Sequence, residues 1–176
     1  MRRHLGAILA MMGWAGGAAV LPAQTAPATA VLPPEHVALV RADTLHDVAL
    51  VRLEQGRPVI YYNARLMARI GPELSTFFLA HEFGHVKEGH AGSALVERET
   101  DRRQEVIQRM ELAADCEAAK ALATERPDAV QEAVTFFTRM GTHRFDVQHP
   151  TGAQRAAKIL ACAAAARAAS APFARP

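Results

Sequence analysis

Residues 72–89 read PELSTFFLAHEFGHVKEG, and this stretch decides the architecture that we expect. Pro72 suits the first turn of a helix and the glycine at the end suits the position just after one, so the sequence predicts a helix that ends at Glu88. Within it, His81 and His85 are four residues apart and lie on one face, about one turn apart along the axis. Two imidazole rings in this arrangement can bind one metal ion.

Residues 81–85 complete the pattern His-Glu-x-x-His, which helical zinc peptidases use to build a catalytic site. Glu82 projects beside the metal rather than onto it, where it can act as general base on a water that the metal activates. Zinc lowers the pKa of such a water to about 7, and Glu82 can pass the proton to a leaving amine. The pattern predicts one Zn²⁺ per chain and hydrolysis of peptide bonds. A helix that keeps the motif without binding metal is the alternative.

A catalytic zinc site needs a third protein ligand and leaves a fourth position open. Glu111 is the stronger candidate, because Glu111 and Asp115 are four residues apart and share one face of a second expected helix. Glu111 would bind the metal, and Asp115 would accept a hydrogen bond from the outer ring N–H of a ligand histidine. Alternatively, both carboxylates belong to the solvated face of a charged helix.

His90 is the weaker candidate for the third ligand. The longer pattern HExxHxxGxxH requires glycine at position 88 and histidine at position 91, where this chain has Glu88 and Ala91. If the helix continued to position 90, His90 would lie about 180° around the axis from His81 and point away from the metal. We therefore expect a surface or structural role for His90.

Two strands and three further helices are expected around these motifs. The segments 48–53 and 58–62 predict a β-hairpin with Gly56 in its turn. Helical patterns occupy residues 97–125, 127–140 and 152–169. The sequence thus predicts an α+β fold that is mainly helical, with a small hairpin or sheet before the motif helix.

Three motifs follow one another along the chain: HEFGHVKEGH at 81–90, ELAAD at 111–115, and a His-Pro pair that begins at His149 and is followed by Arg155. Together they resemble the gluzincin metallopeptidases, especially the CAAX prenyl protease and HtpX-like family. The likeness covers residues 58–160 and is greatest for the soluble periplasmic branch, as a minimal catalytic core. Members that span the membrane have several transmembrane helices, and no such set is evident in this sequence.

The resemblance implies a zincin-like metallopeptidase fold, with a third ligand supplied by the ELAAD element. It also implies that His149 approaches the metal, where it would stabilise an oxyanion or cap the metal as a reversible fourth ligand. Arg155 would pair with a carboxylate near the site. A loop histidine and an exposed helical arginine are the corresponding alternatives.

The amino terminus has the pattern of a secretory signal peptide. Arg2 and Arg3 precede an apolar run, and no charged residue occurs from Leu5 to Pro34. Cleavage is expected after Ala23, which gives a periplasmic or secreted protein; an uncleaved membrane anchor is the alternative. Without Arg2 and Arg3 the basic and acidic side chains are equal in number, so a nucleic-acid partner is not expected.

The chain thus divides into segments of different composition. Cys116 and Cys162, inside the main domain, are expected to form a disulfide in an oxidising compartment, with two buried free thiols as the alternative. The expected segments are a signal peptide at 1–23, a flexible Ala/Pro-rich segment at 24–34, a zincin-like domain at 35–169 and a flexible tail at 170–176.

The leading interpretation is an exported zinc-dependent endopeptidase that hydrolyses proteins or peptides of the cell envelope. A second interpretation is a zinc-stabilised binding or chaperone-like envelope protein without catalysis. A third is a regulatory zincin similar to the ImmA/IrrE-like group, which acts in the cytoplasm beside a DNA-binding partner. The expected signal peptide favours the first two.

Overall fold

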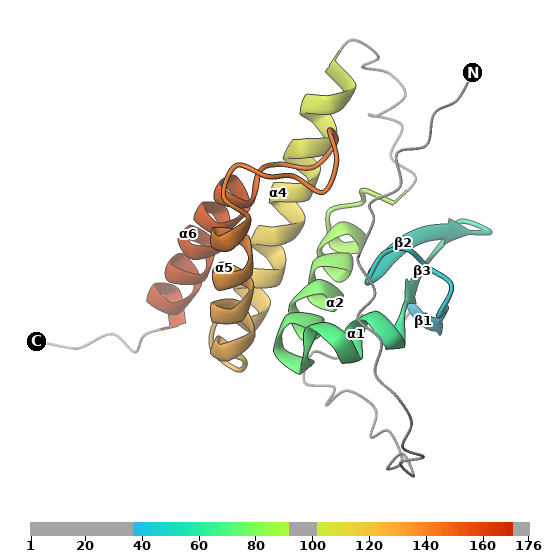
Figure 1. Ribbon diagram of the computed structural model, residues 1–176, viewed down its shortest axis with the longest axis horizontal. Helices are drawn as coiled ribbons and strands as arrows, with labels where there is room; N and C mark the ends of the chain where they lie inside the picture. The colour runs from blue at the N-terminus through green and yellow to red at the C-terminus, as the bar shows by residue number, and fades with distance from the viewer. Residues whose placement is uncertain (1–36, 92–101, 171–176) are drawn as a thin grey trace, which may run out of the picture.

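The computed structural model describes residues 37–91 and 102–170, which form a mainly helical α+β fold with one small sheet (Figure 1). This confirms the coarse fold class expected from the sequence. The signal peptide expected at 1–23, the segment at 24–34 and all of the expected tail except Ser170 lie outside the described residues. The described elements are β1 (Ala38–Arg41), β2 (Ala49–Glu54), β3 (Arg57–Tyr62), α1 (Ala64–Ile70), α2 (Pro72–Lys87), α4 (Arg103–Leu122), α5 (Pro127–Met140) and α6 (Gly152–Ser170).

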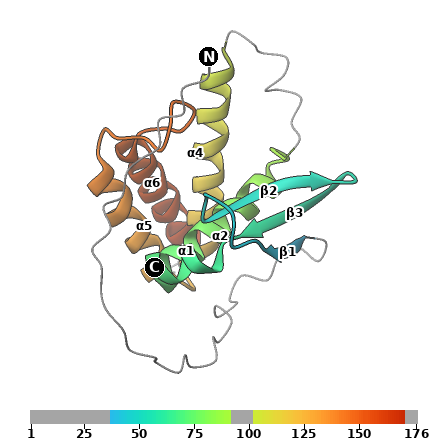
Figure 2. The same cartoon turned by 45° about the vertical axis from the view of Figure 1, so that its right-hand side comes forward.

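The sheet has the strand order β1-β3-β2, so β3 lies in the middle and β2 at one edge (Figure 2). β2 and β3 form the predicted antiparallel hairpin, with Ala49 opposite Tyr62. Its two turn residues, Gln55 and Gly56, have φ values of 51° and 76°, as a tight two-residue hairpin loop requires. β1 pairs with β3 in parallel and was not predicted, because its sequence Ala-Leu-Val-Arg lacks an alternation of polar and apolar residues.

A short helix, α1, leads from the sheet into α2. Asn63 caps α1, because its side-chain oxygen accepts hydrogen bonds from the backbone N–H groups of Arg65 and Leu66, both at 3.0 Å. Gly71, with a φ of 90°, separates the two helices, and Pro72 begins α2 as predicted. α1 was not predicted, since its seven residues are too few to show a helical period.

The remaining helices follow the sequence pattern closely. α5 confirms the helix predicted at 127–140, and α6 extends the one predicted at 152–169 by a single residue. α4 ends three residues earlier than predicted and is followed by a turn over residues 123–125. Arg126, which precedes Pro127, leaves helical geometry with a φ of −135°. The predicted beginning of that helix, residues 97–101, lies outside the described residues.

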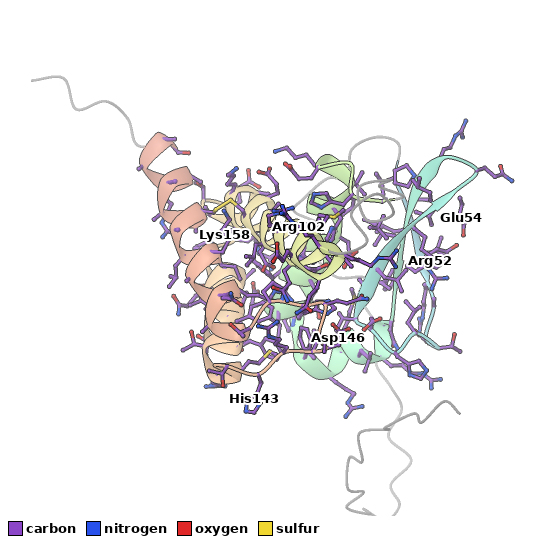
Figure 3. The ribbon with its side chains drawn as sticks, turned by 90° about the horizontal axis from the view of Figure 1, so that it is seen from above. Arg52, Glu54, Arg102, His143, Asp146 and Lys158 are labelled. Atoms are coloured by element: carbon purple, nitrogen blue, oxygen red, sulfur yellow. A yellow bond between two sulfur atoms is a disulfide. The ribbon has the colours of Figure 1, made fainter. Side chains whose placement is uncertain are left out.

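Four helices, α2, α4, α5 and α6, enclose the apolar core. Viewed from above, α6 and the sheet lie on opposite sides of the molecule, with α2 and α4 between them (Figure 3). The sheet therefore packs on α2 rather than on the centre of the helical bundle, which leaves the motif helix between the sheet and α4. The largest fully buried apolar side chains in this core are Phe77, Leu122, Phe137 and Ile159.

α2 and α4 approach each other closely beside the motif. A Cβ atom on Gly84 would lie 2.7 Å from the backbone oxygen of Ala114, a distance that no side chain tolerates. Glycine at this position therefore allows the two helices to touch, and it brings ELAAD of α4 beside HEFGH of α2. Among the described residues, no helix combines the length and apolarity needed to cross a membrane.

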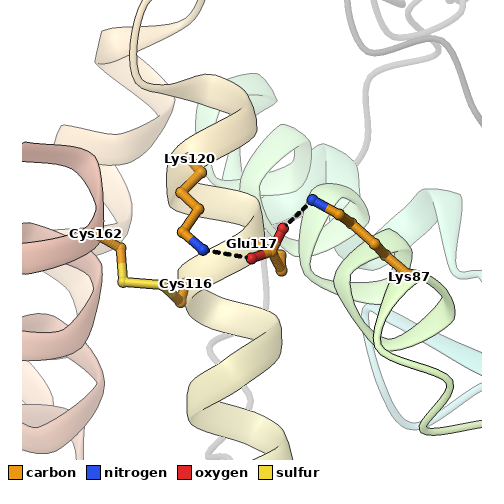
Figure 4. Close-up of a disulfide and its surroundings, with 5 residues drawn as sticks. All are labelled: Lys87, Cys116, Glu117, Lys120 and Cys162. Carbon is orange, nitrogen blue, oxygen red and sulfur yellow. Dashed lines mark hydrogen bonds and ion pairs between the residues drawn. A yellow bond between two sulfur atoms is a disulfide. The ribbon is translucent and has the colours of Figure 1, made fainter. Parts of the chain in front are cut away.

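Covalent and ionic links hold α4 to its neighbours (Figure 4). The sulfur atoms of Cys116 in α4 and Cys162 in α6 lie 1.98 Å apart, as in a disulfide. Glu117, the next residue of α4, forms ion pairs with Lys87 of α2 and with Lys120 one turn further along α4. α4 is thus fixed on both sides just after the segment that carries Glu111 and Asp115.

Candidate metal centre

The two motif histidines point their Nε2 atoms at one another from α2. These atoms are 3.1 Å apart, and the two rings meet edge to face. The side chain of His81 is 5 % exposed and that of His85 is 12 % exposed, because His85 lies closer to the end of the helix. The i, i+4 spacing therefore brings two imidazole nitrogens to one place, as the sequence predicted.

Glu111 of α4 completes a cluster with the two histidines. One carboxylate oxygen lies 3.3 Å from Nε2 of His81, and the other lies 3.3 Å from Nε2 of His85. Ligand atoms of the three residues all lie within 4.8 Å of one another. Atoms 2.0–2.1 Å from a tetrahedral zinc ion would be about 3.4 Å apart, so this donor set and its spacing fit a zinc ion.

Asp115 and Arg155 hold His81 from the side away from Glu111. Asp115 Oδ1 lies 2.9 Å from Nδ1 of His81, which can donate its proton there and leave Nε2 as a free lone pair. Arg155 of α6 donates to both oxygens of Asp115, at 2.8 and 2.6 Å. Asp115 and Arg155 are 0 % and 2 % exposed, so neither belongs to a solvated helix face.

The surroundings shift the pKa values of these groups. Burial alone would lower the pKa of His81, but its hydrogen bonds with Asp115 and Glu111 outweigh burial and raise the pKa to about 9. Burial would likewise raise the pKa of Glu111, yet its hydrogen bonds with His81 and His85 hold it below its ordinary value. The carboxylates of Asp115 and Glu111 thus favour a positive charge at this place, where a cation would sit.

Glu82 is 8 % exposed and lines the same cavity as the three clustered residues. Burial raises its pKa, although the nearby His81 and His85 partly offset this effect. The backbone of Val51, in β2, also stabilises its charged form. Glu82 is therefore a buried carboxylate beside the cluster and outside the donor set, the position expected of a general base.

His149 reaches the site from the loop between α5 and α6. Its Nε2 lies 3.7 Å from a carboxylate oxygen of Glu111, and its Nδ1 lies 2.8 Å from Oδ1 of Asp146. The same oxygen of Asp146 accepts hydrogen bonds from the backbone N–H groups of Gln148 and His149, at 2.8 and 3.1 Å. These hydrogen bonds hold the Asp146 carboxylate and lower its pKa against the opposing effect of burial.

A cavity of about 680 Å³ lies over the cluster. Its walls are the beginning of β2 and the residues before it, α2, α4 and the loop that carries His149. Asp146 lies between the helices and the sheet in the view from above (Figure 3). The larger apolar side chains on these walls are Val48, Leu50, Val51, Phe78, Ile107, Met110 and Phe145.

Two residues beside the cluster have partners that were not predicted from the sequence. His90 was expected to have a surface or structural role, and its Nδ1 lies 3.0 Å from Nδ1 of His85, because α2 ends before it and the chain turns back at Gly89. Asp146 was not considered at all. Its position three residues before His149 was the available signal, since an Asp side chain often accepts hydrogen bonds from backbone N–H groups just after it.

All the residues singled out from the sequence at this site therefore lie together: His81, Glu82, His85, Glu111, Asp115, His149 and Arg155. Comparisons of the chain with protein-family models, with curated proteins and with solved structures found no match.

Proposed function

We propose that this chain is an exported zinc endopeptidase of the gluzincin class, in a zincin-like fold. His81, His85 and Glu111 would hold one Zn²⁺, and Glu82 would act as general base. The observation that carries this proposal is the spacing of the cluster, with nitrogen and oxygen donors 3.1–3.3 Å apart beside a buried carboxylate that does not belong to it. Three protein donors leave a fourth position open, as catalytic zinc sites do.

When bound, the zinc ion supplies a Lewis acid that polarises a carbonyl and makes a water easier to deprotonate. Glu82 takes a proton from that water as the water oxygen bonds to the peptide carbon. The carbon–nitrogen bond then breaks, and Glu82 returns the proton to the leaving nitrogen. Burial raises the pKa of Glu82, which makes this carboxylate a stronger base than an exposed one and suits it to accept and return a proton.

His149 would donate a hydrogen bond to the oxygen that becomes negatively charged as the peptide carbon turns tetrahedral. The support for this role is its Nε2, which faces the cluster, while Asp146 holds the opposite nitrogen at 2.8 Å. Arg155 would act through Asp115 on the orientation of His81, without touching the substrate.

An extended peptide would lie along β2. Among the described strands, β2 has a neighbour on one side only, so the backbone groups of its other edge can pair with a substrate. Residues 46–51, which include the first half of β2, line the cavity. Such pairing recognises the peptide backbone, which suits an enzyme that acts on many unfolded proteins or peptides of the envelope.

Export rests on the signal pattern at residues 1–23 and on the disulfide. Disulfides persist in oxidising compartments such as the periplasm, and they are rare in the cytosol. The pairing of Cys116 with Cys162 therefore favours an exported enzyme over a cytoplasmic regulatory zincin.

The test is hydrolysis of fluorescein-labelled casein by the purified protein and its Glu82→Gln variant. The variant keeps the shape of the side chain but cannot accept the proton, so we expect hydrolysis to fall at least about 100-fold while zinc content is unchanged. Glu88→Gln, on the exposed end of the same helix, is the matched control and should retain full activity. Full activity of Glu82→Gln would reject the mechanism. A wild-type protein that holds zinc without cleaving casein would favour the non-catalytic binding protein.

A further inference from the structure

His85 and His81 are held by different kinds of partner. On each ring the Nε2 atom faces Glu111, and the Nδ1 atom faces a second polar group. For His81 that group is Asp115, at 2.9 Å; for His85 it is His90, at 3.0 Å. His90 therefore occupies, around His85, the place that Asp115 occupies around His81.

The local backbone places His90 without help from other elements. After α2 ends, Gly89 adopts a φ of 68°, which turns the chain back over the last turn of the helix. The backbone N–H of His90 then donates to the carbonyl oxygen of His85 at 2.9 Å. The two histidines are thus joined through both backbone and side chain, and their rings lie 5.2 Å apart between centroids.

Two facing imidazole nitrogens can form a hydrogen bond only if one carries a proton and the other offers a lone pair. A His85 ring that binds a metal through Nε2 must carry its proton on Nδ1. Nδ1 of His90 would then accept a hydrogen bond from Nδ1–H of His85, which fixes both the tautomer and the tilt of the His85 ring. His90 is not itself part of the cluster, which among the described residues contains His81, His85 and Glu111.

We propose that His90 is a positioning residue for the metal ligand His85, acting through an Nδ1–Nδ1 hydrogen bond. This inference rests on the proposed function, because it assumes that His85 binds a metal. It assigns a role to a histidine that the motif HExxH leaves out. It also explains why a glycine that can adopt positive φ stands between the helix and His90.

Two variants separate the hydrogen bond from simple packing. His90→Asn keeps a polar atom close to the position of Nδ1, whereas His90→Phe keeps an aromatic ring against His85 but offers no acceptor. Zinc affinity would be measured by competition with a chelator of known affinity, and the geometry of the site by the visible spectrum of the cobalt(II)-substituted protein. Thermal unfolding of the metal-free variants shows whether the fold is intact.

We expect His90→Phe to bind zinc about tenfold more weakly than the wild type, since loss of a partner that orients a ligand histidine costs 10–100-fold. Its cobalt spectrum should change, and its metal-free melting temperature should not. His90→Asn should recover at least half of the lost binding free energy. Wild-type affinity and an unchanged cobalt spectrum in His90→Phe would overturn the inference while leaving the proposed function intact. A wild-type chain that binds neither zinc nor cobalt would overturn both.

Discussion

Two histidines of the candidate metal centre donate to carboxylates in very different surroundings. Nδ1 of His81 lies 2.9 Å from Asp115, and Nδ1 of His149 lies 2.8 Å from Asp146. The Asp115 side chain is 0 % exposed and forms an ion pair with the buried Arg155, whereas the Asp146 side chain is 54 % exposed. We call these the inner side and the outer side of the centre.

This difference in exposure indicates that the two sides have different roles. On the inner side, water is excluded and three helices fix every partner, so the ring of His81 has one orientation. On the outer side, the carboxylate is held by backbone N–H groups of its own loop and remains in contact with solvent. A metal ligand benefits from the first arrangement, and a group that meets a substrate benefits from the second.

The two sides should differ most in the loss of unfolding free energy when one member of the ion pair on each side is replaced. Arg155→Met leaves the Asp115 carboxylate buried without its cation, which should lower the free energy of unfolding by about 3–5 kcal/mol. Asp146→Asn removes an exposed charge and should lower it by about 1 kcal/mol or less. Urea denaturation of both variants checks the contrast. Equal losses would show that the two sides do not differ as described.

Removal of the disulfide should weaken the inner side, because it links α4, which carries Asp115, to α6, which carries Arg155. Cys116→Ala combined with Cys162→Ala opens a link between residues 46 positions apart, which should lower the free energy of unfolding by about 2–4 kcal/mol. A reducing agent should lower the stability of the wild-type protein by a similar amount and leave the double variant unchanged. If reduction destabilises both proteins equally, the loss does not come from this bond.

The close approach of α2 and α4 offers a smaller perturbation of the inner side. In Gly84→Ala the new methyl group meets the backbone of Ala114, so we expect a loss of about 1–3 kcal/mol, together with weaker zinc binding. Glu88→Ala, at the exposed C-cap of the same helix, should change stability by about 0.5 kcal/mol or less. Chemical denaturation and zinc titration measure both effects. A neutral Gly84→Ala would mean that the helices are not in contact there.

The pKa of His81 gives a further test of the inner side in the metal-free protein. Because the folded-state pKa is raised from 6.5 to about 9, the folded chain binds the extra proton and gains stability. This stability is fully present below pH 6.5 and is lost as the pH rises through about 9, with a slope of at most about 1.4 kcal/mol per pH unit. Urea denaturation across this range should show the loss, and His81→Gln should abolish it. A pH-independent wild type would contradict the proposed hydrogen bonds.

The sequence predicted the elements that have a strong period or clear end signals. Pro72, Pro127 and Gly141 bounded two helices correctly, and Gly56 marked the hairpin turn. β1 and α1 were too short to show a period, so tertiary pairing and the Asn63 cap define them instead. Local pattern thus fixed the long elements and left the short connecting ones undetermined.

The site could be predicted as far as helical spacing reaches. The helical spacing predicted that His81 lies near His85 and that Glu111 lies near Asp115. It did not predict the distance between α2 and α4, which carry these two pairs. The contact of His90 with His85 was not predicted, because Gly89 reverses the chain there and no helical period extends beyond it. Asp146 was missed because its partner, His149, lies in a loop, where no period relates one side chain to another.

Zinc content tests the central claim most directly. The wild-type protein, Glu111→Gln and the control Glu105→Gln, an exposed residue in the first turn of α4, would be dialysed against one zinc buffer and analysed by elemental mass spectrometry. We predict close to one zinc per chain in the wild type and the control, and far less in Glu111→Gln, because an amide oxygen is a much poorer zinc ligand than a carboxylate. A folded wild-type protein without zinc, or equal zinc in Glu111→Gln, would contradict the assignment of His81, His85 and Glu111 as a metal site.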